Sequence, residues 1–304
     1  MYQIDFQKPL HIHFIGIGGI SMSGLAEILM GEGFTVSGSD AKESPLTKSL
    51  EAKGAKIFYG QRASNIMDST EAVVYTAAIH SDNPEFAKAK EKNLPMLTRA
   101  QLLGQIMRNY ETPIAISGTH GKTTTTSMVS HILLEGKCDP TISVGGILPA
   151  IGGNIRVGES ETFVTEACEY TNSFLSFSRK SASSLNIDAD HLDFFKDLDD
   201  IRNSFRRFSE LLPSDGTLII NADIPNYQEI TKNLPCRVVT YGLEQEADYQ
   251  AKDITFDKYG HASFTVYKNG RKTGSYYLKF RVCTMYQMLL LPFLSAIFLV
   301  LPKK

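Results

Sequence analysis

The chain has 304 residues, of which 42% are hydrophobic and 21% charged, and its formal net charge is -2. This length allows two domains with separate cores, and the balanced charge lacks the basic excess typical of nucleic-acid binding. The four cysteines include no C-x-x-C pair, so they predict neither a zinc site nor a disulfide framework and favour a cytoplasmic location. The first nine residues lack the basic-then-apolar order of a signal peptide.

The first predicted unit is a strand, a glycine-rich turn and a helix. Residues 10–16 form an apolar run typical of a buried strand, residues 16–24 are rich in glycine, and residues 25–30 favour a helix. A second strand, residues 34–40, ends in Asp40. This order is typical of a dinucleotide-binding fingerprint, although the third glycine is displaced from G-x-G-x-x-G, so a nicotinamide cofactor is only one option. The alternative is an ordinary tight turn in which Asp40 caps a helix.

Strands and helices continue to alternate after this unit. Further strands are predicted at residues 55–58 and 72–75, and helices at residues 84–92 and 99–108. Such alternation predicts a parallel, doubly wound α/β sheet, with its ligand at the carboxyl ends of the strands, over residues 16–21 and near Asp40. The polar stretch 108–113 is the predicted linker, so the first domain is expected at residues 1–109.

A phosphate-binding motif opens the second predicted domain, residues 110–279. A buried apolar strand runs into Gly-Thr-His-Gly-Lys-Thr-Thr at residues 118–124, and a helix-forming series follows. Backbone N–H groups at such a helix start surround phosphate oxygens, Lys122 can reach the β- and γ-phosphates, and Thr123 can hold Mg²⁺. The standard loop has a further glycine where this chain has Ile116, but the strand–loop–helix context predicts ATP binding. The predicted cofactor-binding residues here are Gly118, Thr119, His120, Gly121, Lys122, Thr123 and Thr124.

Two later strand ends carry candidate metal ligands. Glu166 and Glu169 follow one apolar stretch, and residues 188–193 contain three aspartates and His191. In a phosphoryl-transfer site Mg²⁺ is held by a few carboxylates and hydroxyls that leave room for substrate oxygens. For Glu166 and Asp193 the alternative is that they are solvated loop charges.

Taken in chain order, these segments resemble the Mur ligase family. The stretches that carry the resemblance are residues 14–26, 36–40, 73–79, 82–85, 118–124, 166–174, 186–193 and 221–223. The resemblance implies a Rossmann-like N-terminal domain that holds a UDP-sugar, a central P-loop-type α/β ATPase domain and a third, C-terminal Rossmann-like domain.

The resemblance also implies an activity, a cytoplasmic step of peptidoglycan synthesis. ATP, with Mg²⁺, would activate the lactyl carboxylate of UDP-N-acetylmuramate as an acyl-phosphate, and the amine of L-alanine would then form an amide bond. One alternative is a sister ligase that adds a ready-made peptide to the same sugar. Another is a remnant that binds UDP-sugar and ATP without catalysis. A dehydrogenase is the weakest candidate, because an ATP loop has no role in hydride transfer.

Individual residues take roles from the same resemblance. The substrate-binding residues it implies are Gly16, Gly18, Gly19 and Ser21 at the pyrophosphate, Asp40 near the uridine, and Asn154 and Arg156 facing the substrate. The catalytic residues it implies are Lys122, Glu169 and His191, the metal ligands are Thr123, Glu169 and His191, and Asn221 joins the nucleotide-binding set.

The end of the chain departs from the family pattern. After Lys279 a sequence like V-P-G-x-H-N-x-x-N-A-L-A-A is expected, whereas residues 280–293 read F-R-V-C-T-M-Y-Q-M-L-L-L-P-F. Codons allowed by these residues, read one nucleotide earlier, permit V-P-G-V-H-N-V-S-N-A-L-A-A-I. The hypothesis is therefore a frameshift near residues 278–280, which makes 280–304 an out-of-frame apolar tail, leaves the third domain missing and predicts little ligase turnover. No membrane span is expected; the alternative is an apolar anchor at residues 285–301.

Overall fold

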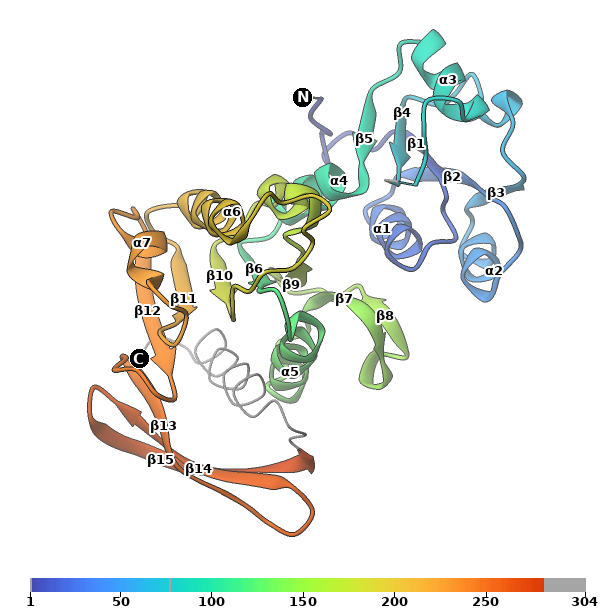
Figure 1. Ribbon diagram of the computed structural model, residues 1–304. Helices are drawn as coiled ribbons and strands as arrows, with labels where there is room; N and C mark the ends of the chain where they lie inside the picture. Colours follow the sequence, from blue (N-terminus) through green and yellow to red (C-terminus); the bar gives the residue numbers. More distant parts are fainter. Residues whose placement is uncertain (1, 77, 282–304) are drawn as a thin grey trace. The chain divides into compact units, whose positions relative to one another are not determined.

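The computed structural model describes residues 2–76 and 78–281, the last three of them by their backbone alone (Figure 1). The predicted out-of-frame tail, residues 280–304, lies outside the described residues from residue 282 onward, and so does the alternative of an anchor at residues 285–301. Within the described part of the chain, no helix has both the length and the apolar character needed to cross a membrane.

The chain divides into two compact units. The first contains the described residues up to Tyr110 together with Thr141–Glu159, and the second contains Glu111–Pro140 and the described residues from Ser160 onward. This grouping differs from the predicted ranges at Thr141–Glu159, which had been expected in the second domain. The segment packs on the first helix of the first unit, where the Asn154 amide donates to the Ile20 carbonyl at 3.1 Å. The domain ranges themselves stay a prediction.

The first unit is built on a parallel sheet with strand order β3-β2-β1-β4-β5, which confirms the predicted α/β class. Its strands are β1 (His11–Ile15), β2 (Thr35–Asp40), β3 (Lys56–Tyr59), β4 (Ala72–Tyr75) and β5 (Met96–Thr98). Its helices are α1 (Ile20–Gly31), α2 (Pro45–Ala52), α3 (Pro84–Glu91), α4 (Arg99–Met107) and the 3₁₀ turns η1 (Ala63–Asn65) and η2 (Pro149–Ile151). An antiparallel pair, β7 (Thr141–Leu148) and β8 (Gly153–Arg156), completes it.

Local sequence signals explain where these helices start. Ser44 and Thr98 form capping boxes at the starts of α2 and α4, and the Asn83 side chain accepts hydrogen bonds from two backbone N–H groups of α3. Such caps satisfy donors that a helix start leaves unpaired. Pro45 and Pro84 occupy the first helical positions, where a missing N–H costs nothing.

Helix α1 approaches β8 so closely that Gly24 has no room for a side chain. A Cβ atom added there would lie 1.9 Å from Cδ1, 2.2 Å from Cγ1 and 2.9 Å from Cβ of Ile155. We therefore expect Gly24→Ala to lower the free energy of unfolding by about 1–3 kcal/mol through overpacking, measured by urea unfolding.

The matched control for this substitution lies in the same helix. A Cβ at Gly31 would meet its nearest neighbour, Val157 Cγ1, at 3.9 Å, an ordinary contact. Gly31→Ala should leave stability unchanged or raise it by up to about 1 kcal/mol, because alanine favours a helix. Equal stability of the two variants would contradict the close packing of α1 on β8.

Glu85, the second residue of α3, is completely buried. Its carboxylate accepts hydrogen bonds from the Ser39 hydroxyl at 2.5 Å and from the Asn65 amide, and His13 Nε2 lies 3.6 Å away. Burial alone would raise the pKa of Glu85, but the nearby imidazole of His13 and the hydrogen bonds from Ser39 and Asn65 outweigh it and lower that pKa below the ordinary 4.5. Folding therefore favours the charged form of this carboxyl group.

This shift predicts part of the acid sensitivity of the protein. A carboxyl group whose pKa is lowered by folding stabilises the fold above its unfolded pKa, and the contribution is lost as the pH falls through the folded value. We expect the free energy of unfolding to fall less steeply below pH 4.5 in Glu85→Gln than in the unmodified chain. Urea unfolding across that range measures the two slopes, and identical slopes would contradict the prediction.

The second unit contains a longer, mixed sheet with the order β15-β14-β13-β12-β11-β10-β6-β9 among its described strands. Neighbours from β9 to β13 run parallel, whereas β13, β14 and β15 are antiparallel. The strands are β6 (Thr112–Ser117), β9 (Thr162–Ala167), β10 (Ser181–Ser184), β11 (Thr217–Asn221), β12 (Arg237–Gly242), β13 (Tyr249–Phe256), β14 (His261–Lys268) and β15 (Arg271–Arg281). The helices are α5 (Lys122–Glu135), α6 (Leu198–Glu210), α7 (Tyr227–Thr231) and the 3₁₀ turn η3 (Tyr170–Ser176).

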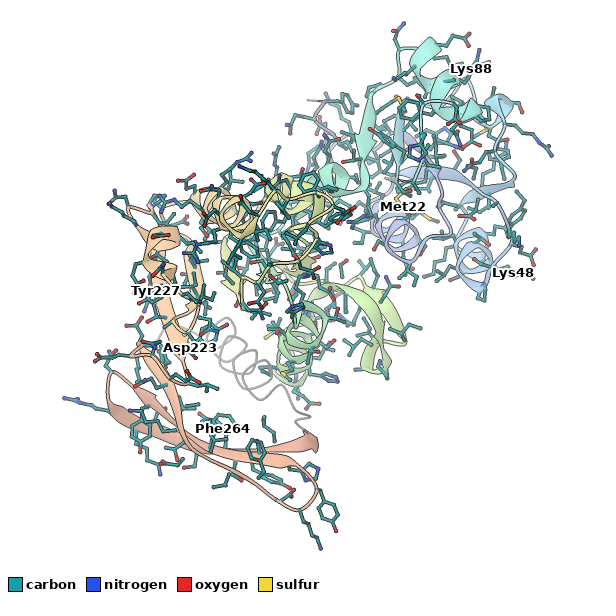
Figure 2. All side chains as sticks on the ribbon, viewed as in Figure 1. Met22, Lys48, Lys88, Asp223, Tyr227 and Phe264 are labelled. Carbon is teal, nitrogen blue, oxygen red and sulfur yellow. The ribbon has the colours of Figure 1, made fainter. Side chains whose placement is uncertain are left out.

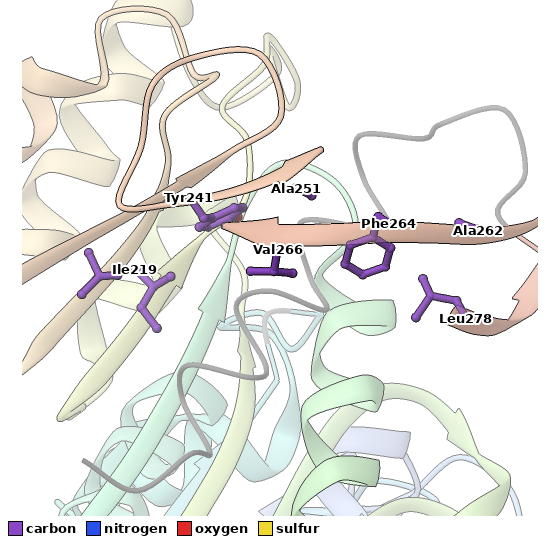
Figure 3. Close-up of a cluster of buried hydrophobic side chains, with 8 residues drawn as sticks. Ile219, Tyr241, Ala251, Ala262, Phe264, Val266 and Leu278 are labelled. Carbon is purple, nitrogen blue, oxygen red and sulfur yellow. The ribbon is translucent and has the colours of Figure 1, made fainter. Parts of the chain in front are cut away.

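Two apolar clusters organise this unit. One joins α5 to the strands beside it through Ile114, Ile116, Val129, Leu133, Val164 and Leu185. The other follows β11, β12 and the antiparallel strands, and Figure 3 shows Tyr241, Phe264, Val266 and Leu278 within it. The first cluster sets the position of α5, whose N-terminus begins at Lys122.

Candidate active site

The glycine turn of the first unit is held by the end of β2. Gly16 has a φ of +85°, and the backbone N–H groups of Gly16 and Ile17 both donate to the Ser39 carbonyl at 2.9 Å. The N–H of Gly18 donates to Asp40 Oδ2 at 2.8 Å, and a Cβ at Gly18 would lie 2.8 Å from that oxygen. A side chain at either glycine would therefore strain or displace the turn.

Asp40 does not cap a helix, so that alternative is wrong. The N-cap of α1 is Gly19, which has no side-chain cap, and the N-cap of α2 is Ser44. The second carboxylate oxygen of Asp40 accepts from the N–H of Ala41 at 2.8 Å. Asp40, the last residue of β2, thus holds the glycine turn in place through its hydrogen bond with the N–H of Gly18.

The other predicted substrate residues of this unit lie around the same turn. Gly19 is exposed and Ser21 is half-buried in the first turn of α1. The buried Asn154 reaches the start of α1 through its bond to the Ile20 carbonyl. Arg156 ends β8, two residues further along the chain. The structure thus brings Asn154 to the glycine turn, although more than a hundred residues separate them.

The predicted phosphate loop connects β6 to α5. Gly118 has a φ of +149° and a Cβ there would lie 2.9 Å from Leu185 Cβ, and Gly121 has a φ of +80° as the N-cap of α5. Both positions therefore require glycine. Ile116, which occupies the position of the missing glycine, is buried within β6 and packs in the core, so the turn begins only at Gly118.

Asn186, in the loop after β10, holds the phosphate loop in place. Its amide accepts from the N–H of His120 at 2.7 Å and donates to the His120 carbonyl at 3.0 Å, and its own carbonyl accepts from the N–H of Thr119 at 3.2 Å. The N–H of Asp188 donates to the Thr119 hydroxyl at 2.9 Å. Interpretation of the sequence did not connect Asn186 or Asp188 with the phosphate loop. The only sequence signal for such a role was their place in the 186–193 stretch.

Lys122 is the first residue of α5, and its ammonium group points back into the loop. It donates to the carbonyls of Gly118 at 2.6 Å and Thr119 at 3.1 Å, and to Glu169 Oε2 at 2.9 Å. Glu169 is 1% exposed and the side chain of Lys122 is 15% exposed, so the carboxylate is buried and Lys122 neutralises its charge. The structure brings together two predicted catalytic residues from separate strand ends.

His191 lies on the other side of Glu169. Its Nε2 is 3.7 Å from Glu169 Oε1, its backbone is left-handed with a φ of +54°, and its ring packs on Tyr170 with centroids 4.7 Å apart. The Tyr170 hydroxyl donates to Asp193 Oδ2 at 2.7 Å, and this bond raises the pKa of Tyr170. Asp193 is therefore tied to the loop after β9, and Tyr170 is a contact of His191 that sequence interpretation missed.

Two further predicted residues have partners of their own. The Thr123 hydroxyl donates to Glu166 Oε2 at 3.0 Å, so Glu166 faces the start of α5. The Asn221 amide donates to the Leu185 carbonyl at 3.0 Å and accepts from the N–H of Asp223 at 2.9 Å. Asp223, labelled in Figure 2, accepts in turn from backbone N–H groups after β12. Asn221 thus joins the end of β11 to the end of β10.

The donor types around Lys122 are suited to Mg²⁺. The Thr123 hydroxyl and the carboxylates of Glu166 and Glu169 offer the oxygen ligands that this ion prefers. Of the predicted metal ligands, Glu169 and His191 lie together, whereas Thr123 contacts Glu166; their role as metal ligands stays a prediction. Across residues 2–76 and 78–281, no group of three or more His, Cys, Asp or Glu side chains is arranged to hold a metal ion.

Two family models match most of the chain. The model described as Mur ligase family, catalytic domain, matches residues 11–111, and the model described as Mur ligase middle domain matches residues 116–287.

Similar individual proteins are found among both sequences and solved structures. A UDP-N-acetylmuramate–L-alanine ligase of Agathobacter rectalis is 62% identical over 270 residues, which cover 89% of this chain and 59% of the relative. The structure of a UDP-N-acetylmuramate–alanine ligase from Thermotoga maritima has a TM-score of 0.78 at 29% identity, covering 95% of this chain and 65% of that one. The structure of a UDP-N-acetylmuramate:L-alanyl-gamma-D-glutamyl-meso-diaminopimelate ligase from Neisseria meningitides has a TM-score of 0.83 at 28% identity, covering 96% of this chain and 94% of that one. This chain thus spans about 60% of the length of the curated relatives it matches.

Proposed function

This chain belongs to the Mur ligase family, and from that premise we propose that it serves the ATP-dependent ligation of L-alanine to UDP-N-acetylmuramate. The observation that carries the proposal is the 62% identity to a UDP-N-acetylmuramate–L-alanine ligase over 89% of this chain. The Lys122–Glu169 ion pair beside the phosphate loop supports the proposal, because phosphoryl transfer needs a cation that neutralises the phosphates and a carboxylate that can hold Mg²⁺.

The chemistry explains why ATP is needed. A carboxylate is a poor acyl donor, since its delocalised negative charge repels nucleophiles. Transfer of the γ-phosphoryl group from ATP to the lactyl carboxylate forms an acyl-phosphate and releases ADP. The free amine of L-alanine then attacks the carbonyl carbon, and the tetrahedral intermediate expels phosphate to leave the amide. The protein contributes mainly positioning and neutralisation of charge.

In the second unit we assign the phosphates of ATP to residues 118–124. The N–H groups at the start of α5 and the ammonium of Lys122 bind phosphate oxygens. We assign Mg²⁺ to Thr123, Glu169 and His191, with Glu166 as a further oxygen donor beside Thr123. The ion would neutralise charge on the phosphate oxygens. Asn186 orients the loop by its paired bonds to His120.

In the first unit we assign the pyrophosphate of the UDP-sugar to the turn at Gly16, Gly18, Gly19 and Ser21. The turn lies at the carboxyl end of β1, where ligands of parallel α/β sheets bind, and it precedes the N-terminus of α1. Asp40 is assigned to the uridine side, and Asn154 and Arg156 to the substrate. Asp40 and Asn154 are supported by their contacts with the turn and the start of α1.

The runner-up is a sister ligase that attaches a peptide to the same sugar, favoured by the fold similarity to the Neisseria meningitides ligase. The higher identity favours the L-alanine ligase, since the Neisseria meningitides match is 28% identical and the L-alanine relative 62%.

The test uses the full chain with ATP, Mg²⁺ and UDP-N-acetylmuramate. Isothermal titration should detect binding of ATP and of the UDP-sugar, and phosphate release should require both the UDP-sugar and L-alanine. Release with tripeptide in place of L-alanine would favour the sister ligase. Binding of both ligands without release would favour a non-catalytic protein, and failure to bind either ligand would refute the proposal.

A further inference from the structure

A continuous line of polar side chains crosses the core of the first unit. Its hydrogen bonds run from Ser69 to His11 at 3.0 Å, from His11 to Ser37 at 2.8 Å and from Ser37 to His13 at 2.9 Å. His13 lies 3.6 Å from Glu85, and Ser39 donates to Glu85 at 2.5 Å. We name these six residues, Ser69, His11, Ser37, His13, Glu85 and Ser39, the polar line.

The register of the sheet explains why these side chains meet. His11 and His13 alternate along β1, Ser37 and Ser39 alternate along β2, and His13 is paired with Ser37 in the parallel ladder. Alternate residues of a strand share one face, so the four side chains lie on the same face of the sheet. Ile12 and Phe14 occupy the opposite face and are completely buried, as an ordinary core requires.

A buried carboxylate lowers the stability of the fold unless hydrogen bonds replace the water that it loses. Glu85 is 0% exposed and His13 is 0% exposed, although apolar residues of similar size would fill the same space. The two ends of the polar line differ in surroundings. Ser69 lies before β4 at the amino edge of the sheet, whereas Ser39 lies at the carboxyl edge.

The carboxyl end of the polar line touches the glycine turn. The Ser39 side chain donates to Glu85, while the Ser39 carbonyl accepts from the N–H groups of both Gly16 and Ile17. The next residue, Asp40, accepts from the N–H of Gly18. His13, three residues before Gly16, contacts Glu85 from β1. Glu85 therefore contacts both β1, which leads into the glycine turn, and the end of β2, which holds that turn.

We propose that Glu85 is a positioning residue for the sugar-nucleotide site: through Ser39 and His13 it holds the glycine turn in place, and the turn sets the direction of the N–H groups at the start of α1 that receive a nucleoside diphosphate. The inference rests on the proposed function of this turn. Diphosphate oxygens need donors in defined directions, and small displacements of such a site lower affinity strongly. The motif Asp82–Glu85, which carried the resemblance, thereby acquires a role.

The test compares Glu85→Gln with Ser69→Ala in the full chain. Glutamine keeps the shape of the side chain but removes the charge that holds Ser39. Ser69→Ala removes a bond at the far end of the same polar line and is the matched control. Isothermal titration with UDP and with UDP-N-acetylmuramate should show affinity lower by about tenfold in Glu85→Gln and unchanged in Ser69→Ala.

A second measurement keeps the proposal separate from the proposed function. In ¹⁵N-resolved spectra the amide signals of Gly16, Ile17 and Gly18 should move in Glu85→Gln and stay in place in Ser69→Ala, with no ligand added. If the unmodified chain binds no UDP-sugar, the proposed function fails, and these signals still decide whether Glu85 orients the turn.

Ser39→Ala provides the variant to use if Glu85→Gln does not fold, and it should move the same signals. In Glu85→Gln with Ser39→Ala the effects should not add, because both act through one bond. Unchanged turn signals in folded Glu85→Gln and Ser39→Ala, or unchanged affinity in a chain that binds the UDP-sugar, would overturn the proposal.

Discussion

Replacing Lys122 by methionine is expected to weaken ATP binding by about 30- to 5,000-fold, which corresponds to the roughly 2–5 kcal/mol typical of truncating one partner of a buried charge pair. Two effects add. The phosphates lose a cation within reach, and Glu169, 1% exposed, is left as an uncompensated negative charge beside them. Isothermal titration with ATP and Mg²⁺ measures the change.

Lys196→Met is the matched control for this substitution. The side chain of Lys196 is 87% exposed and its Nζ lies 3.9 Å from Asp197 Oδ2, so the loss of its charge should change ATP affinity little. ATP affinity in Lys122→Met within a factor of a few of the control would show that this ammonium does not face the phosphates.

Replacing Arg179 by methionine should lower the free energy of unfolding by about 3–5 kcal/mol, because three buried carbonyls each lose a charged hydrogen-bond donor. Arg179 is 4% exposed and donates to the carbonyls of Phe174 and Phe177, and to that of Phe208 near the end of α6, at 2.9–3.0 Å. Its guanidinium also lies 3.8 Å from the centre of the Phe208 ring. It therefore fastens η3 to α6.

Arg207→Met, on the exposed face of α6, is the control for Arg179→Met and should change stability by less than about 0.5 kcal/mol. Urea unfolding compares the two variants. A loss below about 1 kcal/mol in Arg179→Met would mean that water or a rearranged backbone satisfies the three carbonyls.

Much of the fold could be predicted from sequence because it depends on local pattern. The apolar runs that end at Gly16 and Ser117 became β1 and β6, and the glycine-rich segments after them became turns that lead into α1 and α5. The displaced glycine of the phosphate loop also has a local reason, since Ile116 belongs to the strand core. The segment Thr141–Glu159 lies in the predicted range of the second domain but groups with the first unit. A short hairpin carries no local signal of the surface on which it packs.

The candidate site could be predicted only by residue type. The sequence indicated Lys122, Glu169 and His191. In the structure Lys122 Nζ lies 2.9 Å from Glu169 Oε2, and His191 Nε2 lies 3.7 Å from Glu169 Oε1. The sequence did not indicate Asn186, which orients the loop, or Tyr170, which packs on His191. An amide or a phenol in a loop has many possible partners, and its partner is chosen only when the loops of two strands meet.

The sequence by itself determined the parallel α/β class and the two glycine turns, because these depend on strand periodicity and on positions where only glycine fits. Tertiary structure alone decided that Asp40 holds the glycine turn, that Thr123 faces Glu166, and that Glu85 of α3 is buried against side chains of β1 and β2. The physical reason is one of range. Backbone preferences act over a few residues, whereas a charge or hydrogen bond finds its partner across distances that only the folded sheet makes short.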